Sequence, residues 1–314
     1  MRDIWIHKKD FDDIGNAIRE KLDTETEYTI EQMATAIDSI VTEIDETSEF
    51  AKIVDGSITE LNVNMTRIAN QALYGCSNLT SVNLPLATII GEEAFSDCSS
   101  LTTISIPETT DVYYGAFQNC TSLTSISLPK VTNLGGFAFF DCSSLTSISL
   151  PEVVYSGRRI ITGTAVTSIS MPKLITAVYD LFGSCIYLRT VDLPETTTIE
   201  SSVFSGCGSL ISVNIPKATS IGYDAFGSCS ALTTVELPSV TSIGSSAFKW
   251  CSNLTSVILS GSTVCDIYSS GVFNNTPIAS GTGYIYVPAE LVDSYKAATN
   301  WSEYASQIVA IPNE

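Results

Sequence analysis

The chain of 314 residues is long enough for one extended domain or two ordinary ones, and 44% of its residues are hydrophobic while 16% are charged. This composition supports a large buried core and excludes an intrinsically disordered protein. The net charge of -19 argues against a nucleic-acid partner, which would need clustered lysines and arginines. There is no apolar run as long as a membrane helix and no secretory signal at the start. We therefore expect the protein to be made in the bacterial cytoplasm without Sec export, and we expect no insertion into a membrane.

Two helices are predicted within residues 1–50, a segment that holds 14 acidic and 5 basic residues. The first covers residues 10–22, and the second covers residues 29–44 after a capping box of Thr29 and Gln32. Their regularly spaced apolar positions are Phe11, Ile14, Ile18, Leu22, Ile30, Met33, Ile37, Ile40 and Ile44. So short a coiled-coil seam is unstable alone. The hairpin therefore either covers the first repeat or forms an attachment and oligomerisation module, for which we expect a homo-trimer.

The phrase "IGNAIREKLDTETEYTIEQMATAIDSI" lies within this predicted hairpin, at residues 14–40. It resembles a short N-terminal module of tail-associated proteins from phages and prophages of Gram-positive hosts. That resemblance implies attachment to other virion tail proteins through residues 1–50, and it implies no chemistry.

A repeat of 22 residues dominates residues 51–288. Its cysteines stand at positions 76, 98, 120 and 142, and again at 185, 207, 229 and 251, so one residue is deleted between the two blocks. The unit reads A-F-x-x-C-x-x-L-T-S-I-x-L-P-x-x-T-x-I-G-x-x, in which L-x-x-I-x-L predicts a short strand and proline ends it. We expect tight turns with positive φ at Gly91, Gly135, Gly157, Gly222 and Gly244.

This unit resembles the BspA-like, or Treponema-type, leucine-rich repeat over roughly residues 53–288. The resemblance implies a right-handed solenoid with a parallel sheet on its concave side. We expect an α/β solenoid of short parallel strands, with about eleven rungs over residues 51–288, between the N-terminal helical hairpin and a C-terminal helical cap. The cap is predicted as an amphipathic helix within residues 289–314, with its bulk supplied by Leu291, Tyr295, Trp301 and Tyr304.

Eight of the nine cysteines keep the spacing of the repeat, and we predict that they are reduced and buried. Cysteines on separate rungs lack the close paired spacing of zinc sites, so we expect no metal and no cofactor. Cys265 lies outside the repeated position and is predicted to be the most exposed thiol.

Charges alternate at the position that follows each proline, in the order Glu108, Lys130, Glu152, Lys173, Glu195 and Lys217. Stacking of the rungs would place opposite charges next to each other. Each exposed pair stabilises by only about 0 to 1 kcal/mol, so we interpret this column as setting register and solubility.

The sequence offers no catalytic arrangement. His7 is the only histidine and lies outside the repeat, which excludes Ser-His-Asp and Cys-His arrangements within the solenoid. No phosphate-binding glycine motif occurs. Asp192 and Glu236 would lie two rungs apart on one sheet, where a pair of carboxylates could support glycoside hydrolysis, but a solvated face explains them better. We therefore predict that the protein is not an enzyme.

The irregular rung in "VVYSGRRIITGTAV" is the first candidate for ligand binding, because it breaks the repeat. It lacks the cysteine and the phenylalanine of the other rungs and holds Tyr155 and the arginine pair Arg158 and Arg159. Such a rung either kinks the rod or presents a site.

Two further groups are candidates. Asp192, Asn214 and Glu236 form the polar end of the outward strand positions, which are otherwise small hydroxyl residues. Tyr113 and Tyr114 belong to a set of aromatic residues in turns, which either cover the turns or form an adaptable surface for a protein or a sugar. The other members of the set are Tyr74, Phe137, Phe140, Tyr155, Tyr179, Tyr187, Tyr223 and Trp250.

These features predict a phage or prophage tail protein of the receptor-binding or fibre type, located on the virion tail. Residues 1–50 would attach it to other tail proteins, and the repeat would meet a host cell-surface protein or glycan. The alternative is a BspA-like adhesin on a bacterial cell surface. A glycan hydrolase is the weakest hypothesis.

Overall fold

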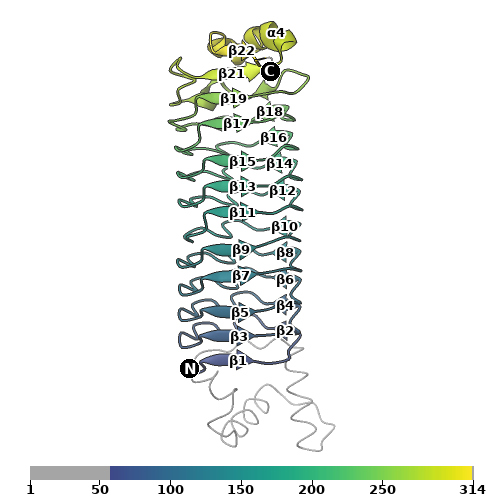
Figure 1. Ribbon diagram of the computed structural model, residues 1–314, viewed down its shortest axis with the longest axis vertical. Coiled ribbons are helices and arrows are strands. Elements are labelled where there is room, and N and C mark those ends of the chain that lie inside the picture. Colours follow the sequence, from purple (N-terminus) through teal and green to yellow (C-terminus); the bar gives the residue numbers. More distant parts are fainter. Residues whose placement is uncertain (1–56, 313–314) are drawn as a thin grey trace, which may run out of the picture.

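The structure is a computed structural model that describes residues 57–312. Over this range the chain coils into a solenoid, and its rungs stack in one column from β1 at one end to α4 at the other (Figure 1). The predicted hairpin of residues 1–50, with its apolar seam from Phe11 to Ile44, lies outside the described residues.

The first sheet confirms the eleven predicted rungs. Each rung contributes one short strand, and the strands of successive rungs form four hydrogen-bonded groups with parallel register, as Thr190 pairs with Ser212. The outer residues of each strand face solvent and the middle residue faces the core, as in Thr234–Glu236. The strands are β1 (Glu60–Asn62), β3 (Ser81–Asn83), β5 (Thr103–Ser105), β7 (Ser125–Ser127), β9 (Ser147–Ser149), β11 (Ser168–Ser170), β13 (Thr190–Asp192), β15 (Ser212–Asn214), β17 (Thr234–Glu236), β19 (Ser256–Ile258) and β21 (Tyr284–Val287).

A second parallel sheet, which the sequence reading did not predict, forms on the return path of each rung. Its strands have two residues, the first partly exposed and the second buried. Two residues are too few to produce an alternating pattern in the sequence. The strands are β2 (Arg67–Ile68), β4 (Ile89–Ile90), β6 (Asp111–Val112), β8 (Asn133–Leu134), β10 (Tyr155–Ser156), β12 (Thr176–Ala177), β14 (Thr198–Ile199), β16 (Ser220–Ile221), β18 (Ser242–Ile243) and β20 (Asp266–Ile267).

A ladder of stacked phenylalanines fills the centre of the solenoid. The rings of Phe182, Phe204, Phe226 and Phe248 are fully buried, with neighbouring centroids 4.9–5.6 Å apart. Phe273 continues this ladder, with its centroid 5.6 Å from that of Phe248, although it does not follow Phe248 at the 22-residue interval of the repeat. These contacts fix the rise of each rung at about 5 Å, close to the strand spacing of a sheet.

The cysteines lie beside this ladder as free, buried thiols, as predicted for eight of them. They also link the rungs, because the Cys120 thiol donates to the carbonyl oxygen of Phe95 at 3.1 Å. The equivalent bond is made by five more thiols, those of Cys98, Cys142, Cys207, Cys229 and Cys251. The Cys185 thiol instead lies 3.9 Å from the Thr162 hydroxyl of the irregular rung. Burial raises the pKa of Cys98 to about 12.

The prediction of an exposed thiol at Cys265 is wrong, because its side chain is only 1% exposed. The C-terminal residues cover it: the Tyr295 hydroxyl accepts the Cys265 amide hydrogen at 3.0 Å, and the Trp301 indole donates to the Cys265 carbonyl at 2.6 Å.

The prediction of positive φ at the repeated glycines is also wrong. None of the five has a left-handed backbone; that conformation occurs two residues later, for example at Glu93 and Asp224. The glycines are required by close approach instead. A Cβ atom at Gly222 would lie 2.5 Å from the backbone of Glu200 and Ser201 on the preceding rung.

The C-terminal cap contains less helix than predicted. A continuous amphipathic helix is replaced by η2 (Ala289–Leu291), α4 (Val292–Ala297) and η3 (Trp301–Tyr304), after the earlier η1 (Ser270–Phe273). The chain turns at Asn300, whose φ is 63°, so that Trp301 and Tyr304 reach the exposed end of the ladder at Phe273. It then ends in an unpredicted strand, β22 (Ile308–Ala310), which pairs with β21 and covers the edge of the first sheet.

Candidate functional site

Of the candidates on the first sheet, Asp192 and Asn214 are joined to each other by a hydrogen bond. Asp192 accepts hydrogen bonds from Ser170 at 2.9 Å and from Asn214 at 2.7 Å. Glu236 lies one rung beyond Asn214, beside Ile258 of the next strand. The side chains of Asp192 and Asn214 therefore link successive rungs, and these contacts give no indication of a ligand.

The irregular rung combines a break in the fold with one exposed aromatic side chain. The second sheet is interrupted between β10 and β12. Here Arg159 makes a 2.6 Å ion pair with Asp180, which is 7% exposed, so this arginine has a structural role. Arg158 lies over the ring of Phe137, 5.3 Å from its centroid, and Tyr155 is exposed.

This rung is repacked and not hollow. Ser156 and Ala177 are small where the adjoining rungs place Leu134 and Ile199, but Ile160 and Leu181 are large where the adjoining rungs place Ala138 and Val203. All of them are buried. Volume lost at one core position is returned at another on the same rung, which preserves packing density.

An aromatic cluster accompanies Tyr113 and Tyr114. Tyr113 and Tyr114 are both exposed, and the Tyr114 ring lies 5.4 Å from that of Phe137, which lies 5.3 Å from Phe140. The rings of Tyr114, Phe137 and Phe140 therefore contact one another, and Phe137 also contacts Arg158, so part of the surface of this cluster is used within the chain.

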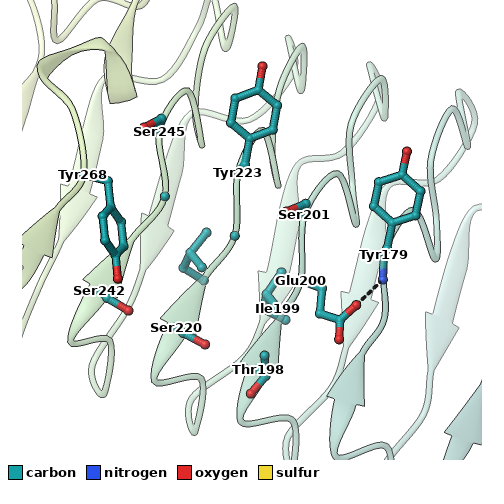
Figure 2. Close-up of a pocket in the computed structure, with 13 residues that line it drawn as sticks. Tyr179, Thr198, Ile199, Glu200, Ser201, Ser220, Tyr223, Ser242, Ser245 and Tyr268 are labelled. Atoms are coloured by element: carbon teal, nitrogen blue, oxygen red, sulfur yellow. Dashed lines mark hydrogen bonds between the residues drawn. The ribbon is translucent and has the colours of Figure 1, made fainter.

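The most open candidate lies further along, on the second sheet. Here a groove of about 600 Å³ runs across β14, β16 and β18 (Figure 2). We call it the tyrosine groove, after Tyr179, Tyr223 and Tyr268, whose side chains are 51%, 58% and 73% exposed. Its volume lies within the range of small-molecule binding sites, although it is an open hollow on the surface and not an enclosed pocket.

The shape of the groove follows from three columns of side chains. One border is formed by the outward residues of the short strands, Thr198, Ser220 and Ser242, and the opposite border carries Tyr179 and Tyr223. Between these columns is the position that the repeat fills with glycine, here Gly222 and Gly244. Without side chains at these two positions, the surface stays hollow.

On the two rungs that flank these glycines, side chains occupy that same position and border the hollow without closing it. Glu200 occupies it on the rung before Gly222, and Tyr268 occupies it on the rung after Gly244. The Glu200 carboxylate accepts the Tyr179 amide hydrogen at 2.7 Å and so holds the turn that presents the Tyr179 ring (Figure 2).

Hydroxyls in and beside the groove fall into two classes. Thr219 and Thr241 each donate to the threonine carbonyl of the preceding rung, both at 3.1 Å. Among the described residues, no hydrogen bond engages the hydroxyls of Thr198, Ser220 and Ser242 or those of the three tyrosines. The fold therefore uses the threonine hydroxyls beside the groove and leaves those of Thr198, Ser220, Ser242 and the three tyrosines without a hydrogen-bond partner among the described residues.

The tyrosines recur at a regular interval along the rod. Tyr179 and Tyr223 lie on the rungs of Phe182 and Phe226, which are separated by ladder steps of 5.6 and 4.9 Å. Tyr268 lies on the rung of Phe273, two further steps of 5.1 and 5.6 Å away. The three tyrosines thus stand about 10 Å apart along the axis.

The sequence analysis named Tyr179 and Tyr223 as aromatic residues in turns but did not identify Tyr268 or the role of Glu200. Ser242 pairs with Asp266, 24 residues later, so a fixed period of 22 misplaces Tyr268. The sequence does hold one signal of the groove: Glu200 and Tyr268 replace the repeated glycine on the rungs before and after Gly222 and Gly244.

Residues 57–312 contain neither a metal-binding cluster nor a membrane-spanning helix. In this part of the chain no three histidine, cysteine, aspartate or glutamate residues are grouped as a metal site would require. No helix described there has the length and apolar character to cross a membrane.

Comparison with known proteins identifies the repeat. The BspA-type leucine-rich repeat profile matches six copies over residues 66–185 and 178–285. A leucine-rich repeat protein from Bacteroides ovatus is 21% identical with a TM-score of 0.51, covering 81% of this chain and 84% of its own. A leucine-rich cell surface protein from Faecalibacterium prausnitzii is 19% identical with a TM-score of 0.36, covering 79% and 82%. No curated protein matches the sequence. The chain belongs to the BspA-type leucine-rich repeat family, whose solenoid is a binding scaffold.

Proposed function

We propose that this protein is a non-enzymatic recognition protein, which binds a cell-surface ligand through the tyrosine groove. The observation that carries the proposal is the groove itself, with three exposed tyrosines around hydroxyls that the fold leaves without partners. Exposed tyrosines supply large contact area at a low cost in conformational entropy, as in other recognition surfaces.

We further propose that the protein is the receptor-binding or fibre component of a phage or prophage tail. The resemblance of residues 14–40 to tail-associated modules supports this placement. Residues 1–50 would attach the protein to other tail proteins and form a trimer, and the solenoid would project toward the host cell.

A bacterial surface adhesin is the second candidate, and membership of the BspA-type family favours it. Electron microscopy distinguishes the two. Gold-labelled antibodies against the protein should mark the tails of particles induced from the strain that carries the gene. Label confined to the surface of the producing bacterium would favour the adhesin instead.

Binding to whole cells tests the recognition role in either setting. Fluorescently labelled full-length protein should bind cells from a panel of Gram-positive bacteria, and the triple variant Tyr179→Ala, Tyr223→Ala and Tyr268→Ala should lose that binding. Tyr187→Ala is the matched control, because Tyr187 is 56% exposed and lies outside the groove. Equal binding by the triple variant would refute a role for the groove.

A further inference from the structure

We infer that the tyrosine groove binds an extended, uncharged polysaccharide of the β-1,4-linked type, lying parallel to the axis of the solenoid. The inference rests on the proposed recognition function and names the class of its ligand. Three features carry it: the spacing of the tyrosines, the free hydroxyls, and the charge of the groove.

The spacing fits a polymer better than a single small ligand. Tyr179 and Tyr223 project the same way from rungs about 10 Å apart, with their hydroxyls directed outward (Figure 2). In an extended β-1,4-linked chain, successive sugars are turned over, so an equivalent ring face recurs at every second sugar. That disaccharide repeat is close to the interval between the tyrosines, so one chain would stack on both rings in the same way.

The hydroxyl column supplies the polar half of the contact. Pyranose rings present apolar C–H faces and polar edges, so they suit an aromatic ring beside hydrogen-bonding groups. Thr198, Ser220 and Ser242 come from successive rungs, about 5 Å apart, opposite the tyrosines. Each sugar along the chain therefore meets one hydroxyl whose donor and acceptor positions are not used within the described residues.

The charge of the groove excludes an acidic polymer. Glu200 is the one ionisable carboxylate that lines it, and no lysine or arginine lines it. The whole chain carries a net charge of -19, so an anionic glycan would be repelled both locally and at long range. The ligand is therefore an uncharged glycan.

The test is isothermal titration of the full-length protein with four hexasaccharides. Cellohexaose and chitohexaose are uncharged and extended, maltohexaose is uncharged but curved through its α-1,4 links, and hexagalacturonate is anionic. We expect binding of cellohexaose or chitohexaose, with at least about tenfold weaker binding of the other two.

Substitutions then locate the binding. Tyr223→Ala should weaken it about five- to tenfold, as the loss of one stacked ring does, and the triple tyrosine variant should abolish it. Ser220→Tyr should also abolish it by placing a ring in the groove, while Tyr187→Ala should change nothing. Unchanged thermal unfolding would show that each variant is folded, since all these positions are partly or largely exposed.

Two results would overturn the inference: no binding of either extended hexasaccharide, or equally tight binding that survives the triple substitution. If cell binding depends on the three tyrosines while neither hexasaccharide binds, the ligand class is wrong and the recognition function stands. If the hexasaccharides bind through the tyrosines while cells bind the triple variant normally, the ligand class holds and the proposed function fails.

Discussion

Replacing Gly222 by alanine should destabilise the solenoid strongly, although alanine is the mildest substitution available. The added Cβ would lie 2.5 Å from the carbonyl carbon of Glu200 and from the amide nitrogen of Ser201, about 1 Å closer than an ordinary contact. Both atoms belong to the backbone, which cannot rotate away as a side chain can. The two rungs would have to separate.

The structure allows the cost of that separation to be worked out. The Gly222 amide donates to the Ile199 carbonyl at 2.7 Å, and a displacement of about 1 Å would break this bond. A buried backbone hydrogen bond left unmade costs about 1–3 kcal/mol, and overpacking costs a similar amount. We expect a loss of about 3 kcal/mol in the free energy of unfolding, or a fall of about 6 °C in Tm for a chain of this size.

Gly115→Asn provides the comparison, because Gly115 does have a left-handed backbone, with φ of +60°. A Cβ there would lie 3.2 Å from Cγ of Glu93, a flexible side chain, and asparagine tolerates this conformation. We expect a cost below about 1 kcal/mol. Thermal and urea unfolding of the full-length variants would measure both. If Gly222→Ala costs no more than Gly115→Asn, the close-approach explanation is wrong.

Three further predictions follow from buried groups. All nine thiols are buried, so Ellman's reagent should detect none in the folded protein and nine after denaturation; one reactive thiol in the folded state would contradict the burial of Cys265. Burial raises the pKa of Cys98 and Cys265 to about 12, against 9.0 in the unfolded chain. The contribution of these thiols to stability is therefore complete below pH 9 and decreases as the pH rises from 9 toward 12. The urea midpoint should fall between pH 8 and pH 10, and a constant midpoint would refute this. Arg159→Ala leaves the largely buried carboxylate of Asp180 unpaired and should cost about 1–3 kcal/mol, because the arginine itself is partly exposed, whereas Lys173→Ala removes an exposed pair and should cost less than about 1 kcal/mol; equal urea midpoints would contradict the structural role of Arg159.

The architecture of the solenoid could be predicted from the sequence because every rung solves the same packing problem. Phe204 stacks on Phe182 of the preceding rung and the Cys207 thiol donates to the Phe182 carbonyl, so the sequence must repeat both residue types at the period of the coil. The alternating charges also paired as predicted, with Lys130 bonded to Glu108 and Lys217 bonded to Glu195. A period therefore reveals the contacts that every rung must make.

The reason for a repeated residue was harder to predict than its position. A glycine at a fixed place in a turn satisfies two different needs, positive φ or close approach of another chain segment, and the sequence looks the same in both cases. At Gly222 the second need applies. In the same way, Cys265 falls outside the repeat, but the cap that buries it is assembled from Tyr295 and Trp301, about 30 residues later.

The candidate site could be predicted only in part, because it forms across rungs and not along the chain. Tyr179 and Tyr223 were identifiable as aromatic residues in turns. Their relation to Ser220 and Gly222 depends on the register of the second sheet, and two-residue strands leave almost no signal for that register. Tyr268 was hidden for a further reason, because the rung that carries it is longer than the others.

Residues that hold the rungs together and residues that face solvent occupy different positions of the repeat, and this separation explains how such a scaffold can acquire a ligand. Within a rung, the phenylalanine, the cysteine and residues such as Thr219 are committed to neighbouring rungs, so substitutions there would disturb the stack. The side chains at positions 179, 220 and 223 point outward (Figure 2), and their hydroxyls make no hydrogen bond to a neighbouring rung among the described residues. Tyrosines can therefore be introduced or removed there at little cost in stability, and the fixed rise of the rungs sets their spacing. A ligand that repeats at a multiple of that rise is the one such a surface can match at several points at once, which is why a regular polymer suits the tyrosine groove.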